Sequence, residues 1–184
     1  MACAKNCTAD ACRSILATQM VYDTANSGGV SADGTTFPKI NAGFDANQIE
    51  DRGVVSFNVP GVPINSIVES AKLSFQVRSS GASDVFSVLG PLQIVTADYT
   101  AFGSSACANS KLNENVTSVS AFGKVSVNVP SLVGRRTAAL TKVQFCAYFA
   151  PTSGTNTASK GITLSNTGSA DEVQLELIVA SPPE

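Results

Sequence analysis

Histidine and tryptophan are absent from the sequence, and charged residues are scarce. Asp, Glu, Lys and Arg make up 14% of the 184 residues, whereas about 25% is usual in soluble proteins. Without histidine, the chain lacks the commonest general base, and the Ser-His-Asp and Cys-His arrangements of nucleophilic catalysis are excluded. We therefore predict that the protein is not an enzyme.

The charges that are present form no run of one sign. Twelve Lys and Arg against 14 Asp and Glu give a formal net charge of -2, and no basic cluster is large enough to neutralise a phosphate backbone. No apolar stretch reaches the roughly 18 to 20 residues that a membrane span requires. We expect neither a nucleic-acid partner nor insertion into a membrane.

The cysteine pattern favours disulfides over a metal site. The chain has five cysteines and no histidine, and no two cysteines form a C-x-x-C pair, so the pattern is typical of disulfides formed in an oxidising compartment. Because five is an odd number, one thiol stays free or links to another chain. The disulfide candidates are Cys3, Cys7, Cys12, Cys107 and Cys146.

The first residues indicate an exported protein. Met1 is followed by no apolar core of a secretory signal, and segment 3–14 resembles the cysteine-bearing start of many secreted fungal proteins just after signal cleavage. We expect the mature part of a secreted, extracellular protein with Met1 added for expression. The sequons at 6–8 (Asn-Cys-Thr) and 115–117 (Asn-Val-Thr) fit that location.

Alternation of apolar and polar residues dominates the chain and predicts β-strands. In 173–179, for example, Gln174 and Glu176 stand between apolar residues and would face water. Turn signals separate such segments at the spacing of a sandwich, and no long amphipathic helix is present. The other expected strands are 15–22, 55–59, 71–77, 85–95, 125–129, 143–149 and 162–164.

Half-buried strands in this number need a second sheet to cover their apolar faces. We therefore predict an all-β fold, a two-sheet antiparallel β-sandwich of jelly-roll-like form, with Phe57, Phe75 and Phe145 in its core. A chain of 184 residues suits one such core. The single sandwich domain is expected over 15–184, after a cysteine-bearing N-terminal arm over 1–14.

Two consecutive segments carry a family resemblance. Residues 52–64 read R-G-V-V-S-F-N-V-P-G-V-P-I, and 67–77 read I-V-E-S-A-K-L-S-F-Q-V. The pair resembles the middle of DNRLRE-type domains, a group related to carbohydrate-binding modules, and the order of the remaining pieces is similar over about residues 15 to 180. The resemblance implies a sandwich that binds carbohydrate. The sequence departs from the family in lacking its tryptophans and in having Asp171-Glu172 where the family has Arg-Pro.

Tyrosine and phenylalanine are the aromatic platforms that remain for a sugar ring. For each of them, packing in the core or anchoring of a loop is the alternative. A pair of arginines in one turn is a candidate binder of acidic polysaccharide, and a solvated loop is its alternative. The candidate carbohydrate-binding residues are Tyr22, Tyr99, Phe102, Tyr148, Arg135 and Arg136, with Phe44 as a further aromatic residue that alternation does not place in the core.

No cofactor is required by the sequence, and a structural calcium ion is the inorganic partner that it favours. Oxygen ligands from loop carboxylates suit calcium. Asp23, Asp171 and Glu172 are the candidate ligands because they lie on loops of the first and last strands; a solvated strand edge is the alternative.

Three functions follow from these observations, in decreasing order of support. The first is a non-catalytic extracellular module that binds cell-wall or matrix polysaccharide. The second is a structural subunit of a surface layer, fibre or adhesin, whose partners are copies of itself and whose cysteine-bearing arm tethers one copy to the next. The third is a polysaccharide-active enzyme, because lyases of jelly-roll form can work with Tyr, Lys and Arg; glycosidase chemistry needs two facing carboxylates, and their spacing singles out no pair.

Overall fold

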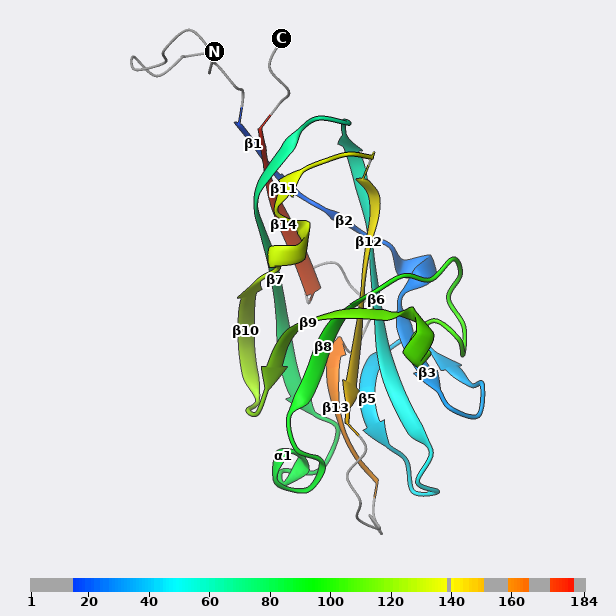
Figure 1. Cartoon of the computed structure of the whole chain (residues 1–184). Coiled ribbons are helices and arrows are strands. Elements are labelled where there is room, and N and C mark those ends of the chain that lie inside the picture. Colours follow the sequence, from blue (N-terminus) through cyan, green and yellow to red (C-terminus); the bar gives the residue numbers. More distant parts are fainter. Residues whose placement is uncertain (1–14, 139, 151–158, 166–172, 181–184) are drawn as a thin grey trace, which may run out of the picture.

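The computed structural model describes residues 15–138, 140–150, 159–165 and 173–180 (Figure 1). The strands are β1 (Ile15–Gln19), β2 (Val21–Tyr22), β3 (Gly28–Ser31), β4 (Thr36–Phe37), β5 (Ile40–Phe44), β6 (Glu50–Val62), β7 (Ile67–Ser79), β8 (Leu92–Ala97), β9 (Leu112–Val119), β10 (Gly123–Asn128), β11 (Gly134–Arg135), β12 (Leu140–Phe149), β13 (Lys160–Ser165) and β14 (Val173–Ala180). The helical segments are η1 (Thr24–Asn26), α1 (Val85–Leu89), η2 (Asn109–Lys111) and η3 (Pro130–Leu132).

Layer A consists of the strands that pair around β7. β14 lies along one side of β7 and β1 follows β14, whereas β10 and β11 lie along the other side, and every pair is antiparallel. In this register Leu73 of β7 stands opposite both Leu175 of β14 and Val127 of β10. The apolar positions of the three strands therefore form one face of the layer.

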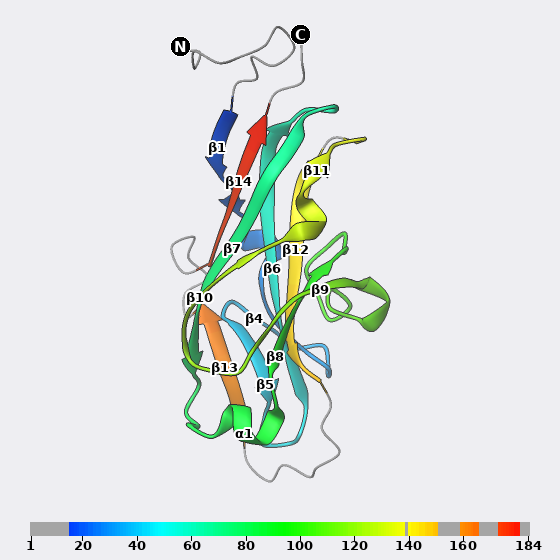
Figure 2. The same cartoon turned by 60° about the vertical axis from the view of Figure 1, so that its left-hand side comes forward.

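Layer B has the strand order β13-β5-β6-β12-β8-β9, with β2 and β3 also paired to β6 and β4 paired to β3. The end of β7, at Arg78 and Ser79, pairs with β13, so the two layers are joined along one side. Figure 2 shows layer A and layer B facing each other. The prediction of an all-β, antiparallel sandwich is confirmed.

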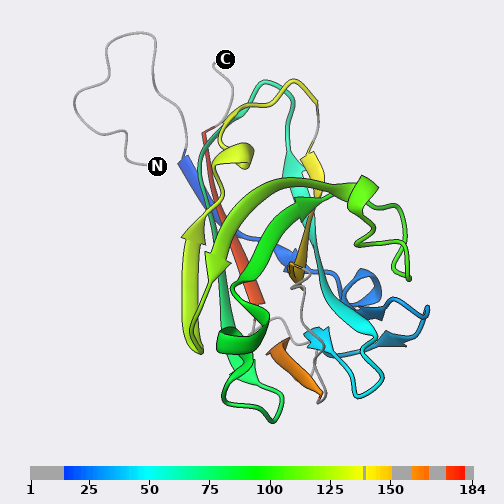
Figure 3. The ribbon, with the colours of Figure 1, turned by 60° about the horizontal axis from the view of Figure 1, so that its bottom comes forward.

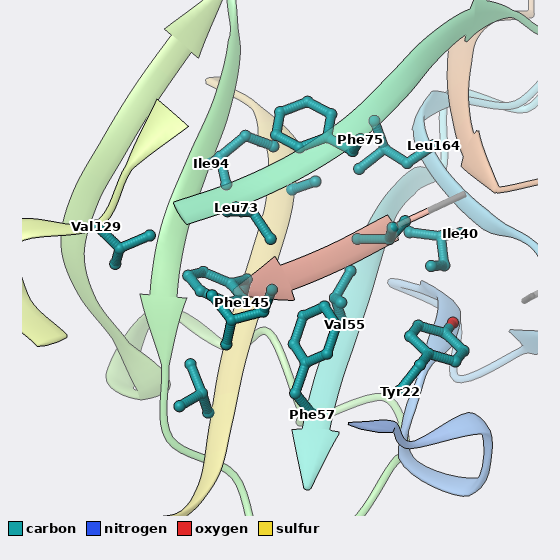
Figure 4. Packing of buried hydrophobic residues seen from close by; sticks show 14 of the residues in the cluster. Tyr22, Ile40, Val55, Phe57, Leu73, Phe75, Ile94, Val129, Phe145 and Leu164 are labelled. Carbon is teal, nitrogen blue, oxygen red and sulfur yellow. The ribbon is translucent and has the colours of Figure 1, made fainter. Parts of the chain in front are cut away.

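The main core fills the space between the inner faces of the two layers. Phe57 of β6 and Phe145 of β12 meet edge to face with ring centroids 6.2 Å apart, and Leu73 and Phe75 of β7 lie opposite them (Figure 4). All four side chains are buried. Alternation therefore placed Phe57, Phe75 and Phe145 correctly.

The predicted strand 85–95 is wrong in its first half. Val85–Leu89 form the helical turn α1, which buries Val85 and Leu89, and β8 begins at Leu92. Gly90 has φ of 77°, which favours glycine, and Pro91 follows it, so the chain turns here instead of extending.

None of the helical segments in the described ranges is long and apolar enough to cross a membrane.

The predicted strand 15–22 is divided between the layers. β1 pairs with β14 in layer A, whereas β2 pairs with β6 in layer B. Between them Met20 is buried, and its backbone N–H donates to the carbonyl of Leu175 at 2.7 Å. The segment thus closes one side of the sandwich.

Candidate functional site

The outer face of layer B is covered by residues 98–111, which we call the covering loop. Beneath it lie outward-facing side chains of three neighbouring strands, Val54, Val95 and Cys146, and the loop adds Ala106 and Cys107 to the same buried cluster. Figure 3 shows the loop, in green, on the same side of the molecule as the blue η1 and β3. Alternation alone predicts that this face is exposed to solvent, whereas in the structure it forms a second, smaller core.

A disulfide joins the covering loop to β12. Cys107 and Cys146 are bonded, with Cα atoms 5.8 Å apart and a sequence separation of 39. Two of the five candidate cysteines therefore pair with each other. Cys3, Cys7 and Cys12 lie outside the described residues.

Arg52 of β6 is a second tie between the sheet and the covering loop. Its Nε and Nη2 donate to the carboxylate of Glu50 at 2.8 and 3.0 Å, and its Nη1 donates to the carbonyl of Cys107 at 2.7 Å and to Asn109 Oδ1 at 3.1 Å. The guanidinium also stacks over Tyr148, 5.1 Å from the ring centroid. Because these contacts use most of its donors, Arg52 is a clamp that holds the loop.

Tyr99 ties the beginning of the covering loop to η1 and to β12. Its hydroxyl donates to the carbonyl of Asn26 at 2.8 Å, and its backbone N–H donates to Gln144 Oε1 at 3.0 Å. The residue is 4% exposed, and this burial raises the pKa of the phenol well above its ordinary value. The hydroxyl therefore stays neutral and remains a hydrogen-bond donor at physiological pH.

A groove of about 470 Å³ opens beside Tyr99, and we call it the Gln144 groove. Residues of β8, β9, η3 and β12 line it together with the start of the covering loop. Leu132 contributes an apolar patch. The polar lining comes from Thr96, Asp98, Asn113, Glu114, Ser131, Lys142 and Gln144.

The Gln144 groove presents hydrogen-bonding groups of both kinds. Gln144 is 6% exposed, and its Nε2 has no hydrogen-bond partner among the described residues. Asp98 and Glu114 are exposed carboxylates, while the ammonium of Lys142 lies 3.6 Å from the carboxylate of Asp23. Donors and acceptors at fixed positions beside an apolar patch are what a site for a polar organic ligand requires.

Two of the predicted sugar platforms are buried rings. Tyr22 is 7% exposed and packs edge-on against Phe57 in the main core, and Tyr99 lies under the covering loop. A ring that solvent does not reach offers no face to a sugar. The interpretation of Tyr22 and Tyr99 as exposed platforms is therefore wrong, although Tyr99 does line the groove.

The other aromatic candidates are half-buried. The Phe102 ring lies so close to Gly28 that a Cβ built there would stand 2.7 Å from Phe102 Cζ, so this ring anchors the covering loop over β3. Tyr148 has the Arg52 guanidinium over its ring, and Phe44 packs against the main core. Contact of these rings with carbohydrate stays a prediction.

The two candidate arginines lie at the end of β11 and directly after it. Arg135 is exposed at the end of β11, opposite Ile67 of layer A. Arg136 is half-buried, and its Nη2 donates to the carbonyl of Leu132 at 3.0 Å, which supports η3 and with it one wall of the Gln144 groove. Binding of acidic polysaccharide by these residues stays a prediction.

Only one of the three candidate calcium ligands is described. Asp23 is buried, and its Oδ2 accepts a hydrogen bond from Asn26 Nδ2 at 2.9 Å and faces the Lys142 ammonium. Asp171 and Glu172 lie outside the described residues. Within the described ranges, no three His, Cys, Asp or Glu side chains gather as a metal site, and calcium stays a prediction.

Sequence reasoning missed Gln144 and Glu114 as site residues. Gln144 stands at a position that alternation assigns to a solvent-exposed strand surface, where a polar side chain needs no explanation. Glu114 lies in β9, a strand that the sequence analysis did not predict. Gln144 is buried because the covering loop lies above it. No local sequence pattern predicts that residues 98–111 fold back over the sheet. A polar residue in the middle of an otherwise apolar strand, as in 143–149, is the one signal that was available.

Comparison with known proteins adds no family to this picture. No protein-family model matches the chain, and no curated protein matches it either. The likeness to DNRLRE-type domains therefore stays a prediction from the sequence.

Proposed function

We propose that the protein is a non-catalytic extracellular module that binds polysaccharide in the Gln144 groove. The observation that carries the proposal is the lining of the groove, in which the exposed carboxylates of Asp98 and Glu114 and the ammonium of Lys142 stand around the apolar Leu132. Such a lining offers both donors and acceptors to one polar ligand.

Sugar hydroxyls suit such a lining because each one both donates and accepts. A hydroxyl can accept from the Lys142 ammonium and donate to the carboxylates of Asp98 or Glu114. Leu132 offers an apolar surface to the C–H side of a sugar ring. Because the Tyr99 ring is buried, we expect recognition through polar contacts, with aromatic stacking playing little part.

Glu114→Ala in a binding assay with immobilised polysaccharides tests the proposal. Losing a hydrogen bond to a charged group costs about 1.5–3 kcal/mol, which corresponds to at least a tenfold weaker Kd. The matched control is Glu69→Ala, an exposed glutamate of β7 in layer A, which should bind like the parent protein. Absence of binding to every polysaccharide tried, or an equal loss in both variants, would contradict the proposal.

A structural subunit of a surface layer, fibre or adhesin is the second candidate, and the cysteine arithmetic favours it. With Cys107 and Cys146 paired, three of the five cysteines remain, and three cannot all pair within one chain. All three precede β1, which lies at one end of the strand order. Disulfide-linked oligomers on non-reducing gels would support this function, and a monomer with one alkylatable thiol would contradict it.

A further inference from the structure

The sequon at 115–117 falls on β9, the strand at the layer B end of the described strand order. β9 pairs with β8, and no other strand of the described chain pairs with it. The second sequon, at 6–8, lies outside the described residues. The strand therefore combines an acceptor motif for N-linked oligosaccharide with an open sheet edge.

Asn115 is placed to carry such an oligosaccharide in the folded protein. The residue is exposed, and its Nδ2 donates to Gln93 Oε1 at 3.2 Å. A glycosylated asparagine keeps one N–H on Nδ2, so Asn115 still has a donor to offer to Gln93 after attachment. Neither of the buried clusters contains Asn115, so a bulky group there displaces no core side chain.

We propose that Asn115 is a site of N-linked glycosylation and that its oligosaccharide shields the open edge of β9. In the transfer step, Asn115 Nδ2 forms a bond to C1 of a sugar supplied by a lipid diphosphate oligosaccharide. The bond between C1 and the diphosphate oxygen breaks, the lipid diphosphate leaves with its electron pair, and the amide gives up one proton. No oxidant or reductant takes part.

Shielding is needed because β9 carries little other protection. An open edge presents unpaired N–H and C=O groups to other strands, and charged side chains, proline or a cover usually block such pairing. β9 has one charged residue, Glu114, and no proline. A hydrated oligosaccharide on Asn115 keeps a second strand from approaching this edge. Glycosylation of Asn115 requires no ligand in the Gln144 groove.

The experiment uses the full chain secreted from a eukaryotic host, with Asn6→Gln to leave a single sequon. We expect an intact mass that exceeds the polypeptide mass by an oligosaccharide, which a peptide amidase removes while converting Asn115 to Asp. Thr117→Ala should abolish the added mass, and Thr117→Ser should keep it. Asn113→Gln, on the same strand but outside any sequon, should leave the added mass unchanged.

The shielding is measured by sedimentation of the secreted protein before and after removal of the oligosaccharide. We expect self-association to rise after removal and to fall again when a lysine is introduced on the same edge by Ser118→Lys. Secreted, folded protein without added mass would overturn the glycosylation site. Added mass with identical sedimentation before and after removal would overturn the shielding role.

Discussion

The inner and outer faces of layer B are built from the same strands but held in different ways. The inner face presents Val55, Phe57 and Phe145, which pack against layer A without a polar contact between them. The outer face presents Gln144 and Cys146 on alternate positions of β12, and it is closed by a disulfide and by hydrogen bonds. Burial of apolar area therefore stabilises the inner face, whereas a few individual ties position the outer face.

The largest expected effect follows from truncation on the inner face. Phe57→Ala removes a ring that is 0% exposed and that contacts both Tyr22 and Phe145. We expect the free energy of unfolding to fall by about 3–5 kcal/mol, from lost burial and the cavity left behind. Urea unfolding followed by circular dichroism measures it. A smaller loss than that of Val54→Ala on the outer face would contradict the larger share of stability that we assign to the inner face.

Removal of the disulfide should have the next largest effect, and a more local one. Cys107→Ser with Cys146→Ser opens a loop closed over a sequence separation of 39, which is expected to cost about 2–4 kcal/mol. Hydrogen exchange should quicken in the covering loop more than in β6 or β7. Uniform loss of protection across both layers would show that the disulfide supports the whole fold.

Tyr99→Phe removes a single hydrogen bond that holds the covering loop on the outer face. The variant loses the hydrogen bond from the hydroxyl to the Asn26 carbonyl and leaves that half-buried acceptor without this partner. We expect a loss of about 0.5–1.5 kcal/mol in unfolding free energy. Tyr148→Phe is the matched control, because Tyr148 is half-buried and contacts Arg52 through its ring face. Equal losses in the two variants would be inconsistent with this role of Tyr99.

The smallest expected effect is a change in the pH dependence of stability. Burial, together with the nearby carboxylates of Asp45, Asp33 and Glu50, raises the pKa of Asp51 above its ordinary value of 3.8. The folded state then binds more protons than the unfolded state just above pH 3.8, so the contribution of Asp51 to stability falls as pH rises through the folded pKa. Asp51→Asn should flatten the pH dependence of urea midpoints in that window. An unchanged slope would contradict the raised pKa.

The contrast between the two faces also explains what the sequence could predict. Alternation reports which residues of a strand share a face, so it placed Phe57, Phe75 and Phe145 in the core and gave the sandwich. It failed where a short apolar run, Val85–Leu89, folds as a turn because Gly90 and Pro91 follow it. Local pattern could not distinguish that turn from a strand.

The candidate site was harder to predict because it depends on contacts between distant segments. The partner of Cys107, the clamp at Arg52 and the burial of Tyr99 and Gln144 all result from the covering loop folding back over β6 and β12. Periodicity carries no information on such long-range packing. Tyr99 was therefore singled out as an exposed aromatic residue, whereas it acts through its hydroxyl and backbone.

Titration with polysaccharide fragments, followed by amide chemical-shift changes, is the sharpest test that the ligand binds in the Gln144 groove. We predict that the shifts cluster on Asp98, Tyr99, Glu114 and Gln144, with none on the polar face of layer A around Glu69. Shifts centred on layer A, or no shifts with any fragment at concentrations that saturate typical carbohydrate-binding sites, would contradict the account.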